Sequence, residues 1–301
     1  MREESFDESL QQSTFNAFEA LVSGKDDAID LAQAAFLIAS IAYPQLNIAS
    51  YMAQLDALAQ RVGDILGLAK PDTHVPLALV LPSDIDRRAV LEAINRVLFE
   101  QEHFSGNGED YYNPANSFLN DVLERQVGIP ITLSLLYIEV GRRIGLPLDG
   151  IGLPFHFVVG CRLPDCILYI DPFERGVIYN EHECRERVRR MLKGRTKLHP
   201  QWFQPVSKRQ FLARMLNNLK HIYMSREEYE RALSICTLLV LLVPALPAER
   251  RDRGVVHLHL KHYMHALRDL TAYIDRAPDA EDRSEVQRQI KSLRQFISMM
   301  N

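Results

Sequence analysis

The amino-acid sequence predicts an α+β fold in which a small antiparallel sheet lies between two helical regions. Apolar residues recur at steps of three and four between residues 48 and 66, a spacing typical of an amphipathic helix. Two β-rich runs, 154–161 and 166–173, are separated by only four residues. After residue 205, tyrosine, alanine and proline recur at a spacing of 34 residues. We therefore expect three parts: an N-terminal helical part (1–105), a core that contains the sheet (106–204) and a region of helical repeats (205–301).

The composition is that of a globular protein and argues against several other classes. The chain has 301 residues, of which 47% are hydrophobic and 25% are charged. Its net charge of -4 provides no overall attraction to nucleic acid or to anionic lipid. The longest apolar run, residues 238–246, is about half as long as a membrane-spanning helix requires. We expect one large domain with an appendage, and no association with a membrane.

The cysteine content and the start of the chain both favour the cytoplasm. Four cysteines are too few for a disulfide framework in a chain of 301 residues, and they fit a reducing compartment. The first residues are acidic and rich in hydroxyl groups, and they lack the apolar segment of a secretory signal. The expected localisation is therefore cytoplasmic.

Three helices are expected in the N-terminal part. The pair Asp26-Asp27 can cap a first helix, because a short side chain with an oxygen accepts hydrogen bonds from the free N–H groups of the first turn. Asn47 can cap the second helix in the same way. Ser83 and Asp86 resemble a capping box that begins the third helix.

Two further helices are expected just before the sheet. A short helix ends before Gly128, and a longer apolar helix begins at Pro130. Proline suits the first turn of a helix because its φ angle is already helical and its missing N–H is not needed there. Gly145 ends the longer helix, since glycine is the preferred residue just after a helix.

The two β-rich runs predict a hairpin that brings His156 close to Asp171. If Cys161 and Cys166 form a cross-strand pair, His156 lies directly opposite Asp171 on the same face. Directly opposed side chains have Cβ atoms about 4.5–5.5 Å apart, close enough for a hydrogen bond between imidazole and carboxylate. This pair is the best candidate for chemistry. The alternative is a buried histidine that a neighbouring carboxylate satisfies.

The C-terminal region resembles tetratricopeptide repeats. The recurring residues are Tyr229, Ala232, Leu233 and Pro244, which return as Tyr263, Ala266, Leu267 and Pro278. Gly254 fits the small position of the second unit, whereas Lys220 occupies that position in the first. Two units cannot bury a solenoid core alone, so we expect a final helix with an apolar face to pack against them. The apolar residues of that helix are Val286, Ile290, Leu293 and Ile297. The resemblance implies a protein or peptide partner.

The order of motifs in the core resembles the transglutaminase-like superfamily. The motifs are Gly128-x-Pro130 at the start of an apolar helix, then Pro154-x-His156-Phe157, then Ile170-Asp171-Pro172-Phe173. More narrowly, NSFLNDVLERQVGIPITLSLLYIEVGRRIGLPLDGIGLPFHFVVG is similar to the SirB family, and so is the stretch DLAQAAFLIASIAYPQLNIASYMAQLDALAQRV. The resemblance covers nearly the whole chain. It implies a transglutaminase-like (papain-like) core that is followed by tetratricopeptide repeats.

The resemblance also implies a site from which the nucleophile is missing. Active relatives place a cysteine at or beside the position of Pro130, and this chain has no thiol there. The family usually shows Pro-Gly-His-Phe, whereas Phe155 precedes His156 here, and we expect its ring to narrow the pocket of His156. Thr132 and Ser134 are the nearest hydroxyls, but such groups in apolar helices often bond to a carbonyl of the preceding turn.

We therefore expect a regulatory or protein-interaction protein with a degenerate, non-catalytic site at His156 and Asp171. The alternative is an atypical hydrolase or acyl transferase. In that case Thr132, Ser134 or an activated water would act together with His156 and Asp171.

Two other clusters offer alternative sites. Cys161, Cys166, His182 and Cys184 supply four ligands of the kind that structural zinc uses, but a strand separates the two pairs, so we expect no metal and no cofactor. A basic segment could bind nucleic-acid phosphates, but its interleaved glutamates favour a solvated helix, and nucleic acid is not the expected partner. The basic residues are Arg185, Arg187, Arg189, Arg190, Lys193, Arg195 and Lys197.

Overall fold

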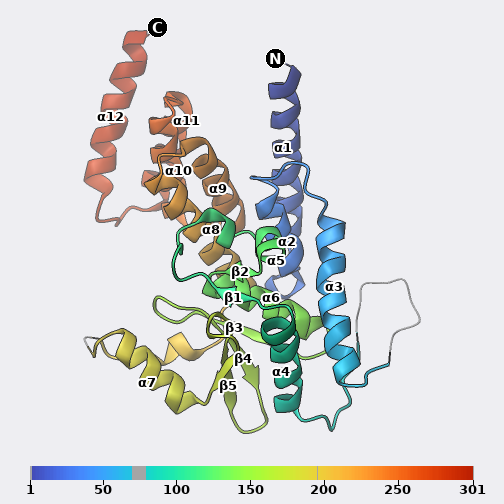
Figure 1. Cartoon of the computed structure of the whole chain (residues 1–301). Coiled ribbons are helices and arrows are strands. Elements are labelled where there is room, and N and C mark those ends of the chain that lie inside the picture. The colour runs from blue at the N-terminus through green and yellow to red at the C-terminus, as the bar shows by residue number, and fades with distance from the viewer. Residues whose placement is uncertain (1, 70–78, 195, 301) are drawn as a thin grey trace. The chain divides into compact units, whose positions relative to one another are not determined.

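The computed structural model describes residues 2–69, 79–194 and 196–300 (Figure 1). Contacts between residues divide the chain into two compact units. The sheet unit comprises Asp30–Ala39 and Gln45–Phe211, and the repeat unit comprises Met1–Ile29, Ser40–Pro44 and Leu212–Asn301. The division of the sequence into three domains at residues 105 and 204 stays a prediction, because contacts alone do not test which segments fold independently.

The sheet unit begins with helices that the sequence largely predicts. Its helical elements before the sheet are α2 (Leu31–Ala39), α3 (Ile48–Ile65), α4 (Arg87–Asn95), the π-helical turn η2 (Arg96–Gln101), the 3-10 turn η3 (Pro114–Asn116), α5 (Leu119–Arg125) and α6 (Pro130–Arg143). Asn47 caps α3 as expected, since its side chain accepts a hydrogen bond from the N–H of Ser50 (3.2 Å). The first turn of α6 begins at Pro130, and Gly145 follows the helix with a φ of 83°.

Two of the expected caps are wrong. Asp26-Asp27 lies inside the short 3-10 turn η1 (Asp26–Ala28), so the pair does not immediately precede α2. Asp30 does this instead, and its Oδ1 accepts from the N–H of Gln33 (2.9 Å). Asp86 caps α4 by accepting from the N–H of Arg88 (2.9 Å), so the cap is this aspartate and not Ser83. In each case the residue directly before the helix acts as the cap.

Helix α6 forms the centre of the sheet unit. Every residue of this helix except Arg142 is buried. Its two buried charged residues are Glu139 and Arg143, which form an ion pair with each other, and Arg143 Nε also donates to Oδ1 of Asp56 in α3 (2.6 Å). Buried charges are tolerated only when they are paired, and here each charge has a partner. The bond between Arg143 and Asp56 also joins α6 to α3.

The small antiparallel sheet follows α6. Its strands are β3 (Asp149–Ile151), β4 (Val158–Arg162), β5 (Ile167–Asp171) and β6 (Val177–Tyr179), and they are ordered β3-β4-β5-β6. Each neighbouring pair is antiparallel, which confirms the predicted hairpin and sheet. A separate parallel pair is formed by β1 (Ser105–Gly106) and β2 (Val127–Gly128). After the sheet come α7 (Glu181–Met191) and the 3-10 turn η5 (Pro200–Phe203).

The predicted register of the hairpin is wrong by two residues. Cys161 pairs with Leu168 rather than with Cys166, and Arg162 pairs with Ile167. The connection still has four residues, but it consists of residues 163–166, and the N–H of Leu163 donates to the carbonyl of Cys166 (2.8 Å). Because side chains alternate along a strand, a shift of two leaves each side chain on the face that the sequence predicts.

The repeat unit is helical. Its elements are α1 (Arg2–Val22), α8 (Lys208–Ser225, of which residues 212–225 belong to this unit), α9 (Tyr229–Leu242), α10 (Pro247–His259), α11 (Tyr263–Arg276) and α12 (Arg283–Met300). The hairpins α8/α9 and α10/α11 correspond to the two expected repeats, and Ala232 and Ala266 are fully buried in them. A Cβ at Gly254 would lie 2.9 Å from Leu270 Cγ, so the helices of the second hairpin approach too closely for a side chain. Along the described chain, none of the helices has the length and apolar character needed to cross a membrane.

Candidate functional site

His156 lies in a tight turn just before β4, not within the strand. Its N–H donates to the carbonyl of Leu153 (3.2 Å), so Pro154 and Phe155 occupy the two central positions. Phe155 has a φ of 58°, a left-handed conformation that glycine adopts at the lowest cost, which explains the glycine of the family motif. The Phe155 side chain is 84% exposed. The expectation that this ring narrows the pocket of His156 stays a prediction.

Asp171, at the end of β5, contacts His156 directly. Its Oδ2 lies 2.7 Å from Nε2 of His156. Its Oδ1 accepts from the N–H groups of Phe173 (3.1 Å) and Glu174 (3.3 Å), so Asp171 caps the 3-10 turn η4 (Pro172–Glu174). Asp171 is fully buried and His156 is 7% exposed. The expected contact is present, although His156 lies in the turn before β4 and not directly opposite Asp171.

Arg187 of α7 is the third member of this cluster. Its Nη2 lies 3.2 Å from Asp171 Oδ2 and 3.2 Å from Glu174 Oε1. Its Nη1 donates to the hydroxyl of Tyr179 (3.2 Å), and the guanidinium lies over the Tyr179 ring at 5.4 Å from the centroid. The buried carboxylate of Asp171 thus receives two backbone N–H groups, an imidazole and a guanidinium. Such full compensation is what a buried carboxylate requires.

Sequence reasoning does not identify Arg187, because it lies in the basic segment that predicts a solvated helix. The one sequence signal that could have pointed to Arg187 is its helical spacing from the apolar residues of the same segment. Cys184 and Val188 are the buried residues of α7, and Arg187 lies three residues after the first and directly before the second. The expectation holds for other residues of the segment: Arg185 pairs with Glu181 at the surface, and Arg189 pairs with Glu186. Arg195 lies outside the described residues.

The two candidate hydroxyls near the start of α6 bond to backbone groups. Thr132 is buried, and its hydroxyl donates to the carbonyl of Asn116 (2.7 Å) and accepts from the N–H of Ile129 (3.1 Å). Ser134 is also buried, and its hydroxyl donates to the carbonyl of Phe157 (3.5 Å). Since Phe157 follows His156, this contact places the second turn of α6 beside the His156 turn. The hydroxyls join backbone segments of the core to one another.

Two of the cysteines considered as zinc ligands, Cys161 and Cys184, are buried where the thiolate is disfavoured. Burial raises the pKa of Cys161, and burial followed by the charge of Asp171 raises the pKa of Cys184 to about 12. Cys166 is exposed in the hairpin loop, and His182 is exposed in the first turn of α7. In residues 2–69, 79–194 and 196–300, no three histidine, cysteine or acidic side chains form a group that could hold a metal. The structure therefore does not assemble the zinc ligands considered from the sequence.

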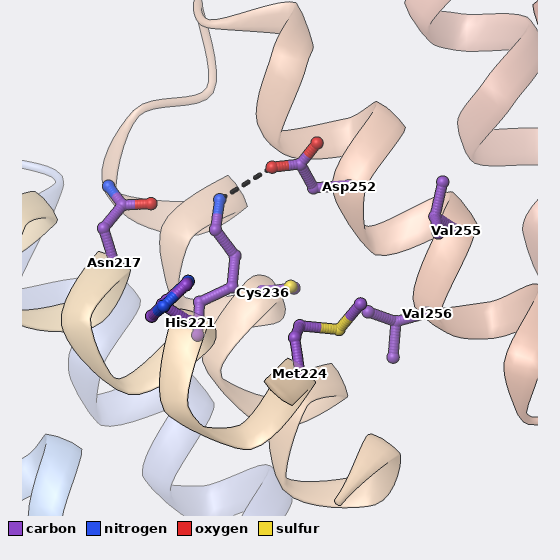
Figure 2. A pocket seen from close by; sticks show the side chains of 8 residues that line it. Asn217, His221, Met224, Cys236, Asp252, Val255 and Val256 are labelled. Carbon is purple, nitrogen blue, oxygen red and sulfur yellow. Dashed lines mark hydrogen bonds and ion pairs between the residues drawn. The ribbon is translucent and has the colours of Figure 1, made fainter. Parts of the chain in front are cut away.

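A second candidate site is a groove between α8 and α10 in the repeat unit (Figure 2). Its volume is about 440 Å³. Met224, Val255 and Val256 provide an apolar surface, while Asn217 and His221 provide polar groups on α8 (Figure 2). The complete lining is Asn217, Lys220, His221, Met224, Cys236, Asp252, Val255 and Val256.

Lys220, which departs from the repeat pattern, links the two helical hairpins across this groove. Its Nζ lies 2.9 Å from Oε2 of Glu249 and 2.8 Å from Oδ2 of Asp252, both on α10. Burial opposes the charge of Lys220, but hydrogen bonds to these two carboxylates outweigh it and raise the pKa of the ammonium. A long cationic side chain thus replaces the usual small residue and bonds to the next repeat.

Comparisons with known proteins agree with this architecture. A family model described as transglutaminase-like superfamily matches residues 49–217, and a tetratricopeptide repeat model matches residues 219–291. A UPF0162 protein from Xylella fastidiosa (strain 9a5c) is 35% identical over 277 residues, which cover 91% of this chain and 93% of the relative. A UPF0162 protein from Vibrio cholerae is 31% identical over 228 residues, covering 73% of this chain and 84% of the relative.

A eukaryotic relative shares a shorter region. F-box only protein 21 from Homo sapiens is 31% identical over 192 residues, which are 58% of this chain but 30% of that protein. No solved structure matches the chain. The fold and the matches define a transglutaminase-like protein with appended tetratricopeptide repeats, which confirms the predicted fold class. Within that class the chain belongs to the UPF0162 family, the SirB-type group that the sequence resembles.

Proposed function

We propose that this chain is a cytoplasmic protein-interaction or regulatory protein that binds a protein or peptide segment in the groove between α8 and α10. The groove carries this proposal, because it combines apolar side chains with polar groups on neighbouring repeat helices. Stacked helical repeats commonly use such surfaces for extended ligands. The four cysteines are free, which agrees with a reducing compartment.

In this proposal the transglutaminase-like core has no acyl-transfer activity. Pro130 offers no nucleophile at the start of α6, and the hydroxyls of Thr132 and Ser134 are bonded to backbone carbonyls. A nucleophilic cysteine needs a lowered pKa, whereas burial raises the pKa of both Cys161 and Cys184. The contacts among His156, Asp171 and Arg187 then serve to hold the His156 turn, β5 and α7 together.

An atypical hydrolase or acyl transferase is the second candidate. One observation favours it: Nε2 of His156 lies 2.7 Å from a carboxylate oxygen, as in catalytic pairs in which a carboxylate orients the imidazole. In this reading Thr132, Ser134 or a water molecule activated by His156 attacks the carbonyl carbon of an ester or amide.

The interaction proposal is tested by capture of partners from cell lysate with variants of the groove. Val255→Arg places a long cation in the groove, and we expect it to reduce recovery of the wild-type partner at least about tenfold. Gln287→Arg adds the same charge to an exposed position of α12 and serves as the matched control. Equal recovery by Val255→Arg and the wild type would show that the groove is not the binding site.

The catalytic alternative is tested with a panel of ester and amide substrates. Purified wild type and His156→Ala are assayed side by side, with circular dichroism to verify that the variant is folded. We expect no turnover from either protein. Hydrolysis by the wild type that disappears in folded His156→Ala would establish the enzyme instead.

A further inference from the structure

A second groove of the repeat unit, here called the α12 groove, lies along one side of α12. Its volume is about 540 Å³, and it shares no lining residue with the groove between α8 and α10. Leu258 near the end of α10, Tyr263 at the start of α11 and Phe296 of α12 provide apolar side chains. The rings of Tyr263 and Phe296 meet edge to face with their centroids 4.9 Å apart, so the start of α11 contacts α12 here.

The α12 groove is elongated. The residues of α12 that line it recur about once per turn, as Glu285, Arg288, Ser292 and Phe296. Residues three or four apart lie on one side of a helix. At 1.5 Å per residue, this side of α12 is about 16 Å long, or about three helical turns. An occupant that fills the groove must therefore be elongated too.

Apolar side chains next to the groove residues are exposed. Phe296 is 45% exposed, and Met299, three residues further along α12, is 85% exposed. Met264, which follows Tyr263 at the start of α11, is 64% exposed. A surface helix normally has polar side chains on its outer side, because apolar ones are unfavourable in water. Exposed apolar side chains around a groove are instead typical of an interaction surface.

A basic stripe runs along α12 from the same groove. Arg288 lines the groove and is followed by Lys291 and Arg294, and residues three apart are neighbours on a helix surface. All three are exposed, and none forms an ion pair with another residue in the described parts of the chain. Lys220 and Arg251, by contrast, bind carboxylates within the repeat unit. The stripe thus presents free positive charge, although the chain has a net charge of -4.

These features define the chemistry of an occupant. The positive charges favour glutamate or aspartate, because complementary charges at the edge of an interface steer association and select the partner. The apolar lining favours a segment whose apolar residues recur at steps of three and four. An amphipathic helix laid along a groove places such residues on one face, and its polar side chains remain at the edge.

We propose that the α12 groove binds an acidic amphipathic helix of a partner protein. The apolar face of this helix packs on Tyr263 and Phe296, and its carboxylates lie beside Arg288, Lys291 and Arg294. This surface goes beyond the proposed function, since it does not use the groove between α8 and α10.

The test measures fluorescence anisotropy of three labelled peptides of about 15 residues, which is long enough to cover the groove, with the full chain. The first peptide has leucines at steps of three and four and glutamate elsewhere. The second replaces each glutamate by lysine, and the third has the composition of the first with its leucines distributed around the helix. We expect the first to bind and the other two to bind at least about tenfold more weakly. Absence of binding by the first peptide, or equal binding by all three, would overturn the proposal.

Variants locate the bound peptide. Lys291→Glu and Phe296→Ser should each weaken binding of the acidic peptide at least about tenfold, whereas Lys197→Glu, at an exposed position of the sheet unit, should leave it unchanged. Circular dichroism verifies that each variant is folded. Val255→Arg, in the groove between α8 and α10, should not weaken binding. Weaker binding in Val255→Arg together with unchanged binding in Lys291→Glu would place the peptide in the other groove and overturn the proposal.

Two measurements distinguish other occupants. Analytical ultracentrifugation detects self-association, and a dimer that is lost in Lys291→Glu would show that the groove is a contact between copies of this chain. Co-sedimentation with vesicles of phosphatidylglycerol and phosphatidylcholine detects binding to an anionic lipid surface, and binding that is lost in Lys291→Glu would identify that surface as the occupant. Either loss would overturn the proposal. A monomer that binds the acidic peptide and not the vesicles would support it.

Discussion

At the scale of single residues, Asp171 holds the candidate site of the core together. It accepts from two backbone N–H groups, contacts the imidazole of His156 and pairs with the guanidinium of Arg187. Its loss would leave several buried groups without a partner at once. Loss of His156 would leave the other contacts of Asp171 in place.

This difference predicts an order of stabilities. His156→Ala should lower the free energy of unfolding by about 1–3 kcal/mol, since one contact of a buried carboxylate is lost. Asp171→Ala should cost more, about 3–5 kcal/mol, because it also leaves the charge of Arg187 without its buried partner. Urea denaturation measures both values, and the exposed Asp165→Ala in the hairpin loop is the control. Equal costs for His156→Ala and Asp171→Ala would contradict this account.

Phe155 supports a second prediction at this scale. Its φ of 58° strains the backbone of any residue with a Cβ, and its exposed ring buries little surface. Phe155→Gly should therefore be more stable than Phe155→Ala by about 1 kcal/mol, although glycine normally destabilises the folded state relative to alanine. Thermal melts of the two variants measure the difference. An alanine variant that matched or exceeded the glycine variant would show that the turn has another conformation in solution.

At the scale of elements, the repeat unit depends on small residues where helices meet. Ala232 and Ala266 are fully buried at equivalent positions of the two hairpins. Replacing either by leucine should lower the free energy of unfolding by about 1–3 kcal/mol through overpacking. Ala272→Leu, at a half-buried position of α11, is the control and should have a smaller effect. Denaturation midpoints that do not change in Ala232→Leu and Ala266→Leu would contradict the equivalence.

The elements also show what the sequence can and cannot predict. The α6 boundaries, the hairpin and the repeats follow from local rules about proline, glycine and apolar spacing, and they are confirmed. The register of the hairpin is not local, because a four-residue loop fits at residues 162–165 and equally at 163–166. Arg187 joins the site only through tertiary packing of α7 on the sheet, and a run of basic residues conceals it. The contact between His156 and Asp171 is predicted from a strand register that is wrong by two residues, and the turn before β4 still brings the imidazole to the carboxylate.

At the scale of the whole molecule, stability should depend on pH through His257. Burial, opposed by Asp269 and reinforced by His265, Arg253 and His262, lowers the pKa of His257 from 6.5 to about 4. The unfolded chain binds a proton at this position at a higher pH than the folded chain does. Protons therefore favour unfolding between these two values, and the stability of the repeat unit falls as the pH decreases from 6.5 towards 4.

Thermal melts across this range measure the effect. His257→Gln should have a smaller loss of melting temperature on acidification than the wild type, while His182→Gln, at an exposed position of α7, should behave like the wild type. Identical pH profiles for His257→Gln and the wild type would show that His257 does not titrate differently in the folded and unfolded chains.

Lys220 has a consequence for what can enter the groove of the repeat unit. Its ammonium is already bound by Glu249 and Asp252, so the chain supplies an internal competitor for any acidic ligand. A ligand carboxylate near Lys220 would meet the negative charges of both side chains, and it would compete with them for the same ammonium. If the groove binds a segment as proposed, we therefore expect it to disfavour acidic ligands and to depend on contacts with the apolar residues Met224, Val255 and Val256. The lysine that departs from the repeat pattern would thus take part in the choice of ligand as well as in the contact between the repeats.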